Sequence, residues 1–418
     1  VDGERRAHHM LPQIPLGVVE LRWENPMRIL LANFSKMVGD TGGAAKVNVA
    51  FANEMVRRGH TVTTVYTDDR EGAFFYPLDE RVTAYNLQHF RGTHCTFPTA
   101  LKIKREVLRA FGQRYGRSVN DEFFAKHIQK NMAAVLDEVQ PDVIICFQTS
   151  SAKMLLCDLR IETPVIIMSH GDPVDLFQTH PKEELPALER CAVFQVLLPG
   201  FAERVQKYIP NVRVVPIGNV VPQYTEQADL AREKEMYKII FIGRMVRNHK
   251  RPHLLIEAFC EIAAEFPDWS LELWGAEDSR SYQKEMQRII ASAGLEDRIS
   301  FCGTTNDVQS VLAAADLYVM PSAYEGFGLS LTEGMSMGLP VIGYQNCAAV
   351  NELIHDGENG FLVEDGVNAL AEKMAALMRD RNLRVRMGRG ARESIRVYAP
   401  EIIWAQWEEL MENVVSHR

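Results

Sequence analysis

The sequence predicts an α/β protein made of two doubly wound domains in tandem. Three observations predict this fold class. Short apolar runs alternate with helical patterns from residue 27 onward, a polar stretch over residues 223 to 237 interrupts the alternation, and a second alternating series follows that stretch. Such alternation is typical of parallel sheets wrapped by helices, and the polar stretch has the composition of a linker.

The first domain is predicted over residues 27 to 220. After the first apolar run, Val47, Ala50, Phe51 and Met55 fall on one face of a helix. Further short apolar runs repeat the pattern of a strand followed by a helix. The runs that predict strands are residues 28–34, 61–66, 143–147, 165–168 and 193–198.

The second domain, residues 221 to 398, shows the same pattern and makes both domains Rossmann-like. Tandem domains of this kind turn the carboxyl ends of both sheets toward one crevice, so we expect the active site in an interdomain cleft. Residues 399–418 are too apolar for a free tail, and we expect a C-terminal helix that crosses back to pack on the first domain. The predicted strands are residues 238–242, 271–274, 299–302, 317–320 and 341–343.

Composition limits the classes of function. The 418 residues carry a net charge of -9, with 46% hydrophobic and 24% charged residues. This acidic balance argues against general nucleic-acid binding, so any bound anion needs a local basic cluster. Seven scattered cysteines are typical of free thiols in a reducing cytosol, and no apolar run approaches the ~18 residues of a membrane-spanning helix. Residues 1–26, with His8 and His9, are interpreted as an extension without function.

The most informative stretch, residues 315–342, combines a strand, a glycine-bearing loop and a helix. Gly326 and Gly328 permit a tight turn and a close approach of the backbone to a ligand. The helix that begins near Leu329 directs free amide groups into the loop, and such a helix end favours phosphate. We therefore expect the loop from Gly326 through Phe327 and Gly328 to Leu329 to line a nucleotide site.

Two carboxylates accompany this loop. Glu325 lies in the loop and Glu333 lies in the helix, eight positions apart. Carboxylates would repel a phosphate, but they accept hydrogen bonds from vicinal hydroxyls, so one could hold a sugar and the other a ribose. The alternative is a chance spacing of two solvated glutamates, and the strand, loop and helix around them disfavour it.

The spacing from Glu325 to Glu333 resembles the Glu-x7-Glu motif of the retaining GT-B glycosyltransferases, in particular family four, which contains bacterial surface-glycan enzymes. The similarity extends over nearly the whole chain from Met27. It implies a GT-B fold, with Glu325 in contact with the donor sugar and Glu333 in contact with the ribose.

Arg244 and Lys250 follow the predicted strand 238–242. A basic pair at the carboxyl end of a strand can hold a diphosphate and stabilise the charge that develops as the nucleotide leaves. Both match positions that hold the diphosphate in the resembled family. A solvated basic turn is the alternative, which fits Arg247 and stays open for Arg251, where many relatives have glycine.

The sequence also bears on metals. It contains no Asp-x-Asp motif and no His or Cys cluster with the spacing of metal ligands. We therefore expect a metal-independent reaction without a cofactor, in which a nucleotide-diphosphate sugar, with UDP as the expected nucleotide, is the co-substrate. Arg244, Lys250 and the helix end near Leu329 would supply the electrostatic stabilisation.

Further candidates lie at other strand ends. Gly42 and Gly43 separate the first strand from its helix, and either a ligand or a plain tight turn explains them. Asp40 stands where starch and glycogen synthases carry lysine, which disfavours a storage-glucan synthase. His170 resembles the family histidine near the donor sugar. Two more glycines, which resemble walls of the base pocket or simple turns, are Gly275 and Gly303.

A basic segment over residues 102–117 is exceptional in this acidic chain. It carries Ile103, Val107 and Phe111 on one helical face and a single acid, Glu106. The segment could rest on anionic lipid near a lipid-linked acceptor, or it could be an ordinary solvated helix. Its cations are Lys102, Lys104, Arg105, Arg109, Arg114 and Arg117.

The leading prediction is a retaining glycosyltransferase that moves a hexose-type sugar to an acceptor hydroxyl of a glycan or lipid in bacterial surface polysaccharide or lipopolysaccharide synthesis. We expect it in the cytoplasm or on the inner face of the membrane. One alternative is a nucleotide-sugar 2-epimerase of the same fold. Another is a noncatalytic partner subunit. Such a subunit would be expected to have lost a motif residue, whereas this chain retains the charged residues Glu325, Glu333, Arg244 and Lys250.

Overall fold

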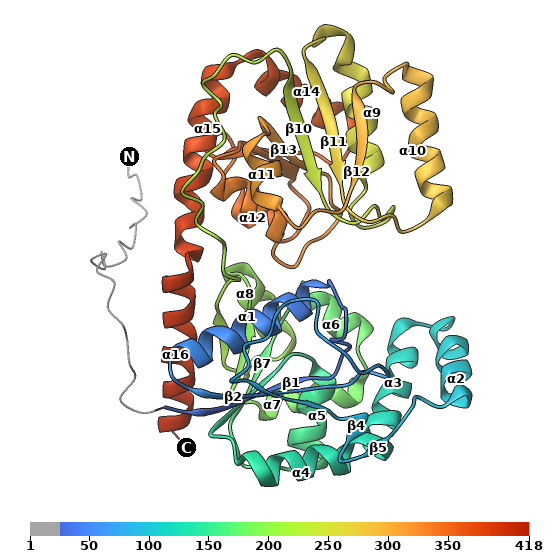
Figure 1. Ribbon diagram of the computed structural model, residues 1–418, viewed down its shortest axis with the longest axis vertical. Helices are drawn as coiled ribbons and strands as arrows, with labels where there is room; N and C mark the ends of the chain where they lie inside the picture. The colour runs from blue at the N-terminus through green and yellow to red at the C-terminus, as the bar shows by residue number, and fades with distance from the viewer. Residues whose placement is uncertain (1–25, 418) are drawn as a thin grey trace, which may run out of the picture.

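The computed structural model describes residues 26–417 and has two α/β halves, one above the other in Figure 1. The predicted extension and its His8 and His9 lie outside the described residues, apart from Pro26. Each half contains one large parallel sheet with helices around it, so the predicted fold class is confirmed.

The N-terminal sheet has seven parallel strands in the order β3-β2-β1-β6-β7-β8-β9. Its central strands β6, β7 and β8 are buried along their whole length, as expected where helices cover both faces. The five predicted strands are confirmed, and two partly exposed edge strands, β3 and β9, are additional. The strands are β1 (Arg28–Asn33), β2 (Thr61–Tyr66), β3 (Thr83–Asn86), β6 (Val143–Cys146), β7 (Val165–Met168), β8 (Val193–Val196) and β9 (Val214–Pro216). A separate antiparallel pair consists of β4 (His89–Phe90) and β5 (Thr93–His94).

Helices connect these strands. The predicted face of the first helix is partly wrong, because Ala50 is exposed whereas Asn48 and Val49 are buried. Asn48 accepts a hydrogen bond from Thr64 on β2, which satisfies its buried oxygen. The helices are α1 (Gly43–Arg57), α2 (Thr99–Arg109), α3 (Gln113–Phe123), α4 (Gln129–Val139), α5 (Thr149–Lys153), α6 (Pro173–Thr179), α7 (Leu185–Arg190) and α8 (Pro199–Tyr208), with short η1 (Phe124–Ile128), η2 (Met154–Asp158) and η3 (Lys182–Glu184) segments.

The C-terminal sheet has six parallel strands in the order β12-β11-β10-β13-β14-β15. All five predicted strands are confirmed, and β15 is an additional edge strand. The strands are β10 (Tyr237–Ile242), β11 (Trp269–Trp274), β12 (Ile299–Gly303), β13 (Leu317–Met320), β14 (Val341–Tyr344) and β15 (Gly360–Val363). The helices are α9 (Pro252–Ile262), α10 (Arg280–Ala293), α11 (Val308–Ala313), α12 (Leu329–Ser336), α13 (Val350–Leu353), α14 (Val367–Arg379) and α15 (Arg381–Ser394), with η4 (Ala263–Glu265) and η5 (Ile395–Tyr398).

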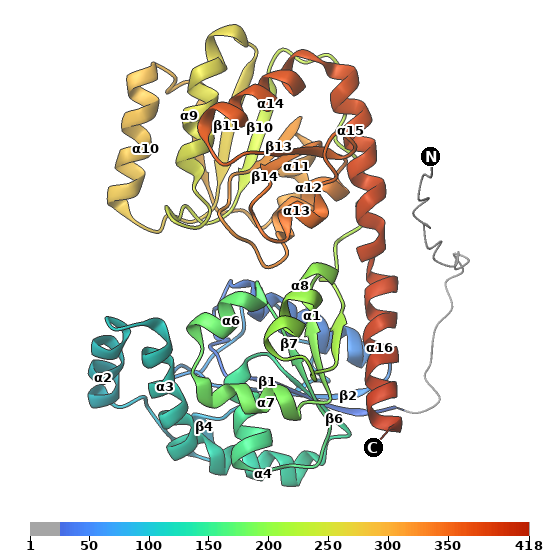
Figure 2. The same ribbon diagram turned by 180° about the vertical axis from the view of Figure 1, so that it is seen from behind.

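The last helix, α16 (Pro400–Ser416), returns to the N-terminal domain, as predicted; it is the red helix that runs beside the lower half in Figures 1 and 2. Trp404 and Trp407 pack edge-on against Phe51 of α1, with ring centroids 5.6 and 5.1 Å away. The two segments that cross between the domains lie side by side, because the Val221 amide donates to the Tyr398 carbonyl over 2.9 Å.

Candidate active site

The loop between β13 and α12 places both predicted carboxylates at the carboxyl edge of the C-terminal sheet. Gly328 has a φ of +72°, which a glycine adopts without strain, and α12 starts at the next residue. No side chain caps this helix start, so its first amide groups stay available. Ser330 fixes the helix start to β10 by donating to the Ile242 carbonyl over 2.8 Å.

Glu325 and Lys250 form a buried ion pair. Lys250 Nζ lies 2.5 Å from Glu325 Oε1, and the two side chains are 15% and 7% exposed. The sequence predicted that both residues belong to the site, and the structure brings them together from segments 75 residues apart. A buried charge pair with this geometry is preorganised, because breaking it would leave one charge unpaired away from water.

The remaining three cations of the basic turn differ in their exposure and in their partners. Arg244 is exposed, and its side chain makes no hydrogen bond or ion pair with the described residues, so its guanidinium group is available to a ligand. Arg247 pairs with Glu285 at the surface, as the solvated alternative predicted. Arg251 is different: its side chain is 16% exposed, pairs with Asp365 over 2.9 Å and has a φ of +49°. The left-handed backbone at this position explains why glycine fits there in the resembled family.

An aromatic pair beside these charges was missed. The rings of His249 and Tyr324 are stacked with centroids 4.2 Å apart, and His249 Nε2 lies 3.0 Å from the Tyr324 carbonyl oxygen. Burial, and then the charge of Lys250, lower the pKa of His249. The pair joins the residue before Lys250 to the residue before Glu325, so it holds the two loops of the ion pair together. Only the adjacency of these residues to the motif could have indicated it.

Glu333 is contacted from the other domain. Lys46 Nζ of α1 lies 3.2 Å from Glu333 Oε1, and the two side chains are 48% and 9% exposed. Sequence reasoning missed Lys46. The available signal was its position three residues after Gly43, in the first turn of the helix that follows the paired glycines.

His170 lies directly opposite Gly326, at the carboxyl end of β7. A Cβ atom on Gly326 would lie 2.3 Å from the His170 carbonyl oxygen, so the two domains touch here. The His170 ring packs on Phe147, and burial lowers the pKa of His170 to about 4. Its Nε2 atom is buried and has no hydrogen-bond partner among residues 26–417. The imidazole is therefore neutral at physiological pH and has one free nitrogen.

The paired glycines form the start of α1. Gly42 is the residue before the helix, and its amide donates to Asp40 Oδ1 over 2.9 Å. A Cβ atom on Gly43 would meet no atom within 4 Å, so packing does not require glycine there. Asp68 at the end of β2, another residue that the sequence did not indicate, accepts the amides of Met37 and Val38 over 3.1 and 3.0 Å and so shapes this loop.

Three glycines meet at the carboxyl edge of β10, β11 and β12. The Gly243 amide donates to the Trp274 carbonyl, and the Gly275 amide donates to the Gly303 carbonyl over 2.7 Å. A Cβ atom on Gly275 would lie 1.9 Å from the Gly243 carbonyl oxygen. Close packing thus requires Gly275, whereas Gly303 has a φ of +71° and free space around it.

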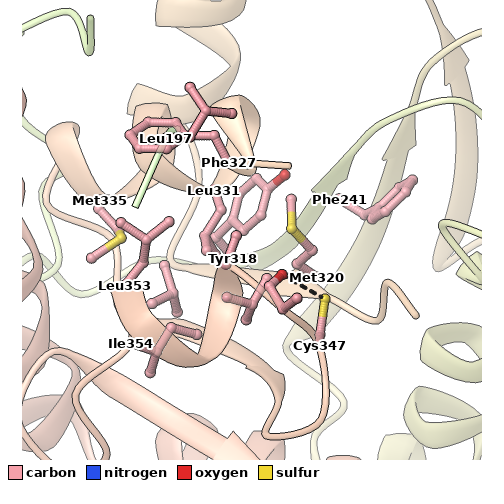
Figure 3. Close-up of a cluster of buried hydrophobic side chains, with 14 of the residues drawn as sticks. Leu197, Phe241, Tyr318, Met320, Phe327, Leu331, Met335, Cys347, Leu353 and Ile354 are labelled. Atoms are coloured by element: carbon pink, nitrogen blue, oxygen red, sulfur yellow. Dashed lines mark hydrogen bonds between the residues drawn. The ribbon is translucent and has the colours of Figure 1, made fainter. Parts of the chain in front are cut away.

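Phe327 needs a correction. It was predicted to line the ligand site, but its side chain is 3% exposed and packs edge-on against Tyr398 at 5.0 Å. Figure 3 shows it within a buried apolar cluster that also contains Leu197 and Leu331. Only the backbone of Phe327 can reach a ligand, because an aromatic ring between two glycines is drawn to the nearest apolar cluster.

Within residues 26–417, no group of three or more His, Cys, Asp or Glu side chains is arranged to hold a metal ion. In the same part of the chain, no helix combines the length and apolar character needed to cross a membrane. The charges of the site are instead carried by Lys250, Arg244, Lys46 and the two glutamates.

The fold belongs to the GT-B class. The chain is similar to the crystal structure of S. aureus TarM in a complex that includes UDP, with a TM-score of 0.69 and 16% sequence identity over 92% of this chain and 100% of that chain.

The chain is also similar in sequence to known glycosyltransferases. Residues 223–394 match the family model described as Glycosyl transferases group 1, so this part of the chain is similar to the domains of that family. An exopolysaccharide phosphotransferase of Streptomyces coelicolor is 30% identical over 355 residues, which cover 82% of this chain and 36% of that relative. An uncharacterized glycosyltransferase of Haemophilus influenzae is 22% identical over 90% of this chain and 98% of that protein. The chain thus spans about a third of the Streptomyces relative.

Proposed function

We propose that this protein is a retaining, metal-independent glycosyltransferase that moves a hexose-type sugar from UDP to an acceptor hydroxyl in bacterial surface polysaccharide or lipopolysaccharide synthesis. The observation that carries the proposal is the buried Lys250–Glu325 pair beside the uncapped start of α12. The group 1 domain supports the class of reaction, and the UDP bound by TarM supports the nucleotide.

The proposed roles follow from the positions of the charges. The open amides of α12 with Lys250 and Arg244 would hold the diphosphate and stabilise the charge that develops on it. Glu325 would accept hydrogen bonds from the sugar hydroxyls, and the free nitrogen of neutral His170 would make a further bond to the sugar.

Retention would follow from attack on the face of the sugar that the diphosphate leaves. The bond from the acceptor oxygen to the anomeric carbon forms as the bond to the phosphate oxygen breaks. The acceptor proton then passes to the departing phosphate. This step needs no enzymic nucleophile, and its main requirement is the preorganised positive charge around the diphosphate.

A screen of nucleotide sugars tests the proposal. A ligand at a hundred times its dissociation constant adds roughly 2.7 kcal/mol of stability, so one donor should raise the melting temperature clearly. The same donor should then be hydrolysed slowly without an acceptor. A panel in which no nucleotide sugar stabilises the protein would overturn the proposal.

Product analysis separates the alternatives. A 2-epimerase would release a free epimer without any acceptor, whereas a transferase gives a glycoside. The Streptomyces relative is named as a phosphotransferase. The shared region is only 36% of that protein, so the name does not support a phosphotransferase activity for this chain. A noncatalytic subunit is disfavoured because Glu325, Glu333, Arg244 and Lys250 are all present.

Peripheral contact with anionic lipid on the cytoplasmic face of the membrane is part of the proposal. Helix α2 has no buried residue and stands at the side of the N-terminal domain away from α16 (Figure 1). Ile103, Val107 and Phe111 are 62%, 55% and 76% exposed. The structure corrects the basic face: Arg114 and Arg117 bond to residues 177–179 at the end of α6 and do not face outward with the apolar residues.

Flotation with vesicles tests this contact. We expect binding to vesicles that contain anionic lipid and loss of binding in Ile103→Ser combined with Phe111→Ser. Tyr208→Ser is the matched control, because Tyr208 is 51% exposed on a different helix. Equal flotation of the double variant and the wild type would exclude the apolar surface of Ile103 and Phe111 as the contact.

A further inference from the structure

The partner of Glu333 is the starting observation. In the described part of the chain, the Glu333 carboxylate makes one side-chain hydrogen bond, which Lys46 Nζ donates to Oε1 over 3.2 Å. Lys46 lies on α1 of the N-terminal domain, 287 residues away in sequence. A carboxylate of the C-terminal domain is therefore held by a cation of the N-terminal domain.

The second carboxylate oxygen is free. A carboxylate has two oxygens with about four acceptor positions, and Lys46 uses one of them. Within residues 26–417, no protein donor reaches Glu333 Oε2, and this atom is not fully buried. It is therefore reachable from solvent, and a ribose hydroxyl can donate to it while the ion pair stays intact.

We infer that Lys46 is a positioning residue that makes ribose recognition depend on contact between the two domains. The inference rests on the proposed role of Glu333. Lys46 fixes the rotamer and charge of Glu333 so that Oε2 faces the ribose, and it does so only when α1 lies against α12. Nucleotide binding and domain contact then favour each other, because each stabilises the same arrangement.

A purely structural ion pair is the competing explanation. Lys46 is half exposed, and an ion pair at such an exposed position contributes little to stability. Such a pair would change the melting temperature slightly and leave the preference for ribose hydroxyls unaltered. The positioning role predicts the reverse, so the two are separable by binding measurements.

The experiment is calorimetric titration of the full chain with UDP, and with the 2′-deoxy and 3′-deoxy forms of UDP. We expect Lys46→Met to weaken UDP about tenfold, a coupling within the usual allosteric range, and to bring the affinities of UDP and its deoxy forms together. Lys46→Arg should restore most of the affinity. Lys104→Met, which removes an equally exposed lysine of α2 from its ion pair with Glu122 of α3, should bind UDP as the wild type does.

A double variant tests the route of the effect. Because Lys46 is inferred to act through Glu333, Lys46→Met should cause no further loss in a Glu333→Gln background. A full additional loss there would show that Lys46 contacts the nucleotide directly and would overturn the inference, as would wild-type affinity and deoxy discrimination in Lys46→Met. If the wild type itself binds no nucleoside diphosphate, the proposed function fails first.

Discussion

The two sides of the interdomain junction differ in how they carry charge. On the C-terminal side, Glu325 is buried and is paired with the largely buried Lys250 before any ligand arrives. On the N-terminal side, Gly42 and Gly43 are exposed, and His170 is neutral because burial lowers its pKa to about 4. The difference means that the C-terminal side carries paired charges in fixed positions, whereas the described N-terminal side offers exposed backbone and a neutral imidazole.

The largest expected effect on transfer comes from removing a cation on the C-terminal side of the junction. Lys250→Ala, and more so Arg244→Ala, should reduce transfer at least about a hundredfold, because the loss of one interaction with developing charge typically costs about 3 kcal/mol. Initial rates at saturating donor measure this effect, and thermal melting checks that each variant is folded.

Arg247→Ala is the matched control for this pair. Arg247 lies in the same turn but pairs with Glu285 at the surface, so its loss should leave transfer near the wild-type rate. If Arg247→Ala were as damaging as Lys250→Ala, the turn would act as a diffuse positive field, and the roles assigned to single residues would be wrong.

The next effect concerns contact between the sides. In Gly326→Ala the added methyl group would lie 2.3 Å from the His170 carbonyl oxygen, so the domains must separate. We expect transfer to fall by roughly tenfold to a hundredfold, because a misplacement of about 1 Å can cost that much. Small-angle scattering should show a more open molecule, and unchanged scattering with full activity would contradict the close contact.

Gly43→Ala tests whether a ligand approaches the N-terminal side of the junction. The methyl group would meet no protein atom within 4 Å, so the fold should be unaffected. A fall in transfer at an unchanged melting temperature would therefore report a ligand close to Gly43. Full activity would favour the tight-turn explanation of the paired glycines.

The two glutamates should differ in kind. Glu333→Ala removes the acceptor for the ribose hydroxyls and should weaken UDP binding about tenfold, whereas Glu325→Ala should mainly lower turnover. Titration with UDP and steady-state rates separate these effects. Equal UDP affinity in the wild type and Glu333→Ala would contradict the ribose role.

His170 should make stability depend on pH. Its pKa is about 4 in the folded protein and near 6.5 when unfolded, so the unfolded state binds more protons between these values. Its contribution is present above pH 6.5 and is lost as the pH falls toward 4, on the order of 1 to 3 kcal/mol. Denaturant titrations should show a larger loss of stability between pH 6.5 and 4 in the wild type than in His170→Gln if this sign is correct.

The smallest expected effect is that of chelation. The proposed site uses Lys250, Arg244 and a helix start where other glycosyltransferases use a metal, so transfer should survive EDTA unchanged. Complete loss of transfer that magnesium or manganese restores would show that Lys250, Arg244 and the helix start do not suffice without a metal ion.

The sequence predicted those parts of the site that depend on local order. Glu325, Glu333 and Gly328 lie within one strand, loop and helix, so their spacing alone placed them together. Lys46 and the contact between Gly326 and His170 depend on how two domains meet, and no local pattern encodes that. The Phe327 error has the same origin, because its ring packs against Tyr398, 71 residues later.

The missed strands have a different cause. β3 and β9 are edge strands with exposed or partly exposed positions, so they lack the continuous apolar run that identified the central strands. The error on α1 arose because Asn48 is buried through a hydrogen bond to Thr64, whereas hydrophobic periodicity counts only apolar residues.

Helix α16 also affects the order in which the two domains can fold during synthesis. The core of the N-terminal domain includes Trp407 and Met411 together with Phe51 and Ile29, and Glu408 of α16 pairs with Arg58. The domain translated first therefore lacks part of its interior until residues 400–416 leave the ribosome, whereas residues 237–398 already contain every strand of the second sheet. Although domains generally fold in the order of their synthesis, this arrangement lets the C-terminal domain finish first. We expect a nascent chain stalled before residue 400 to leave the apolar residues that α16 covers, such as Phe51, exposed to chaperones.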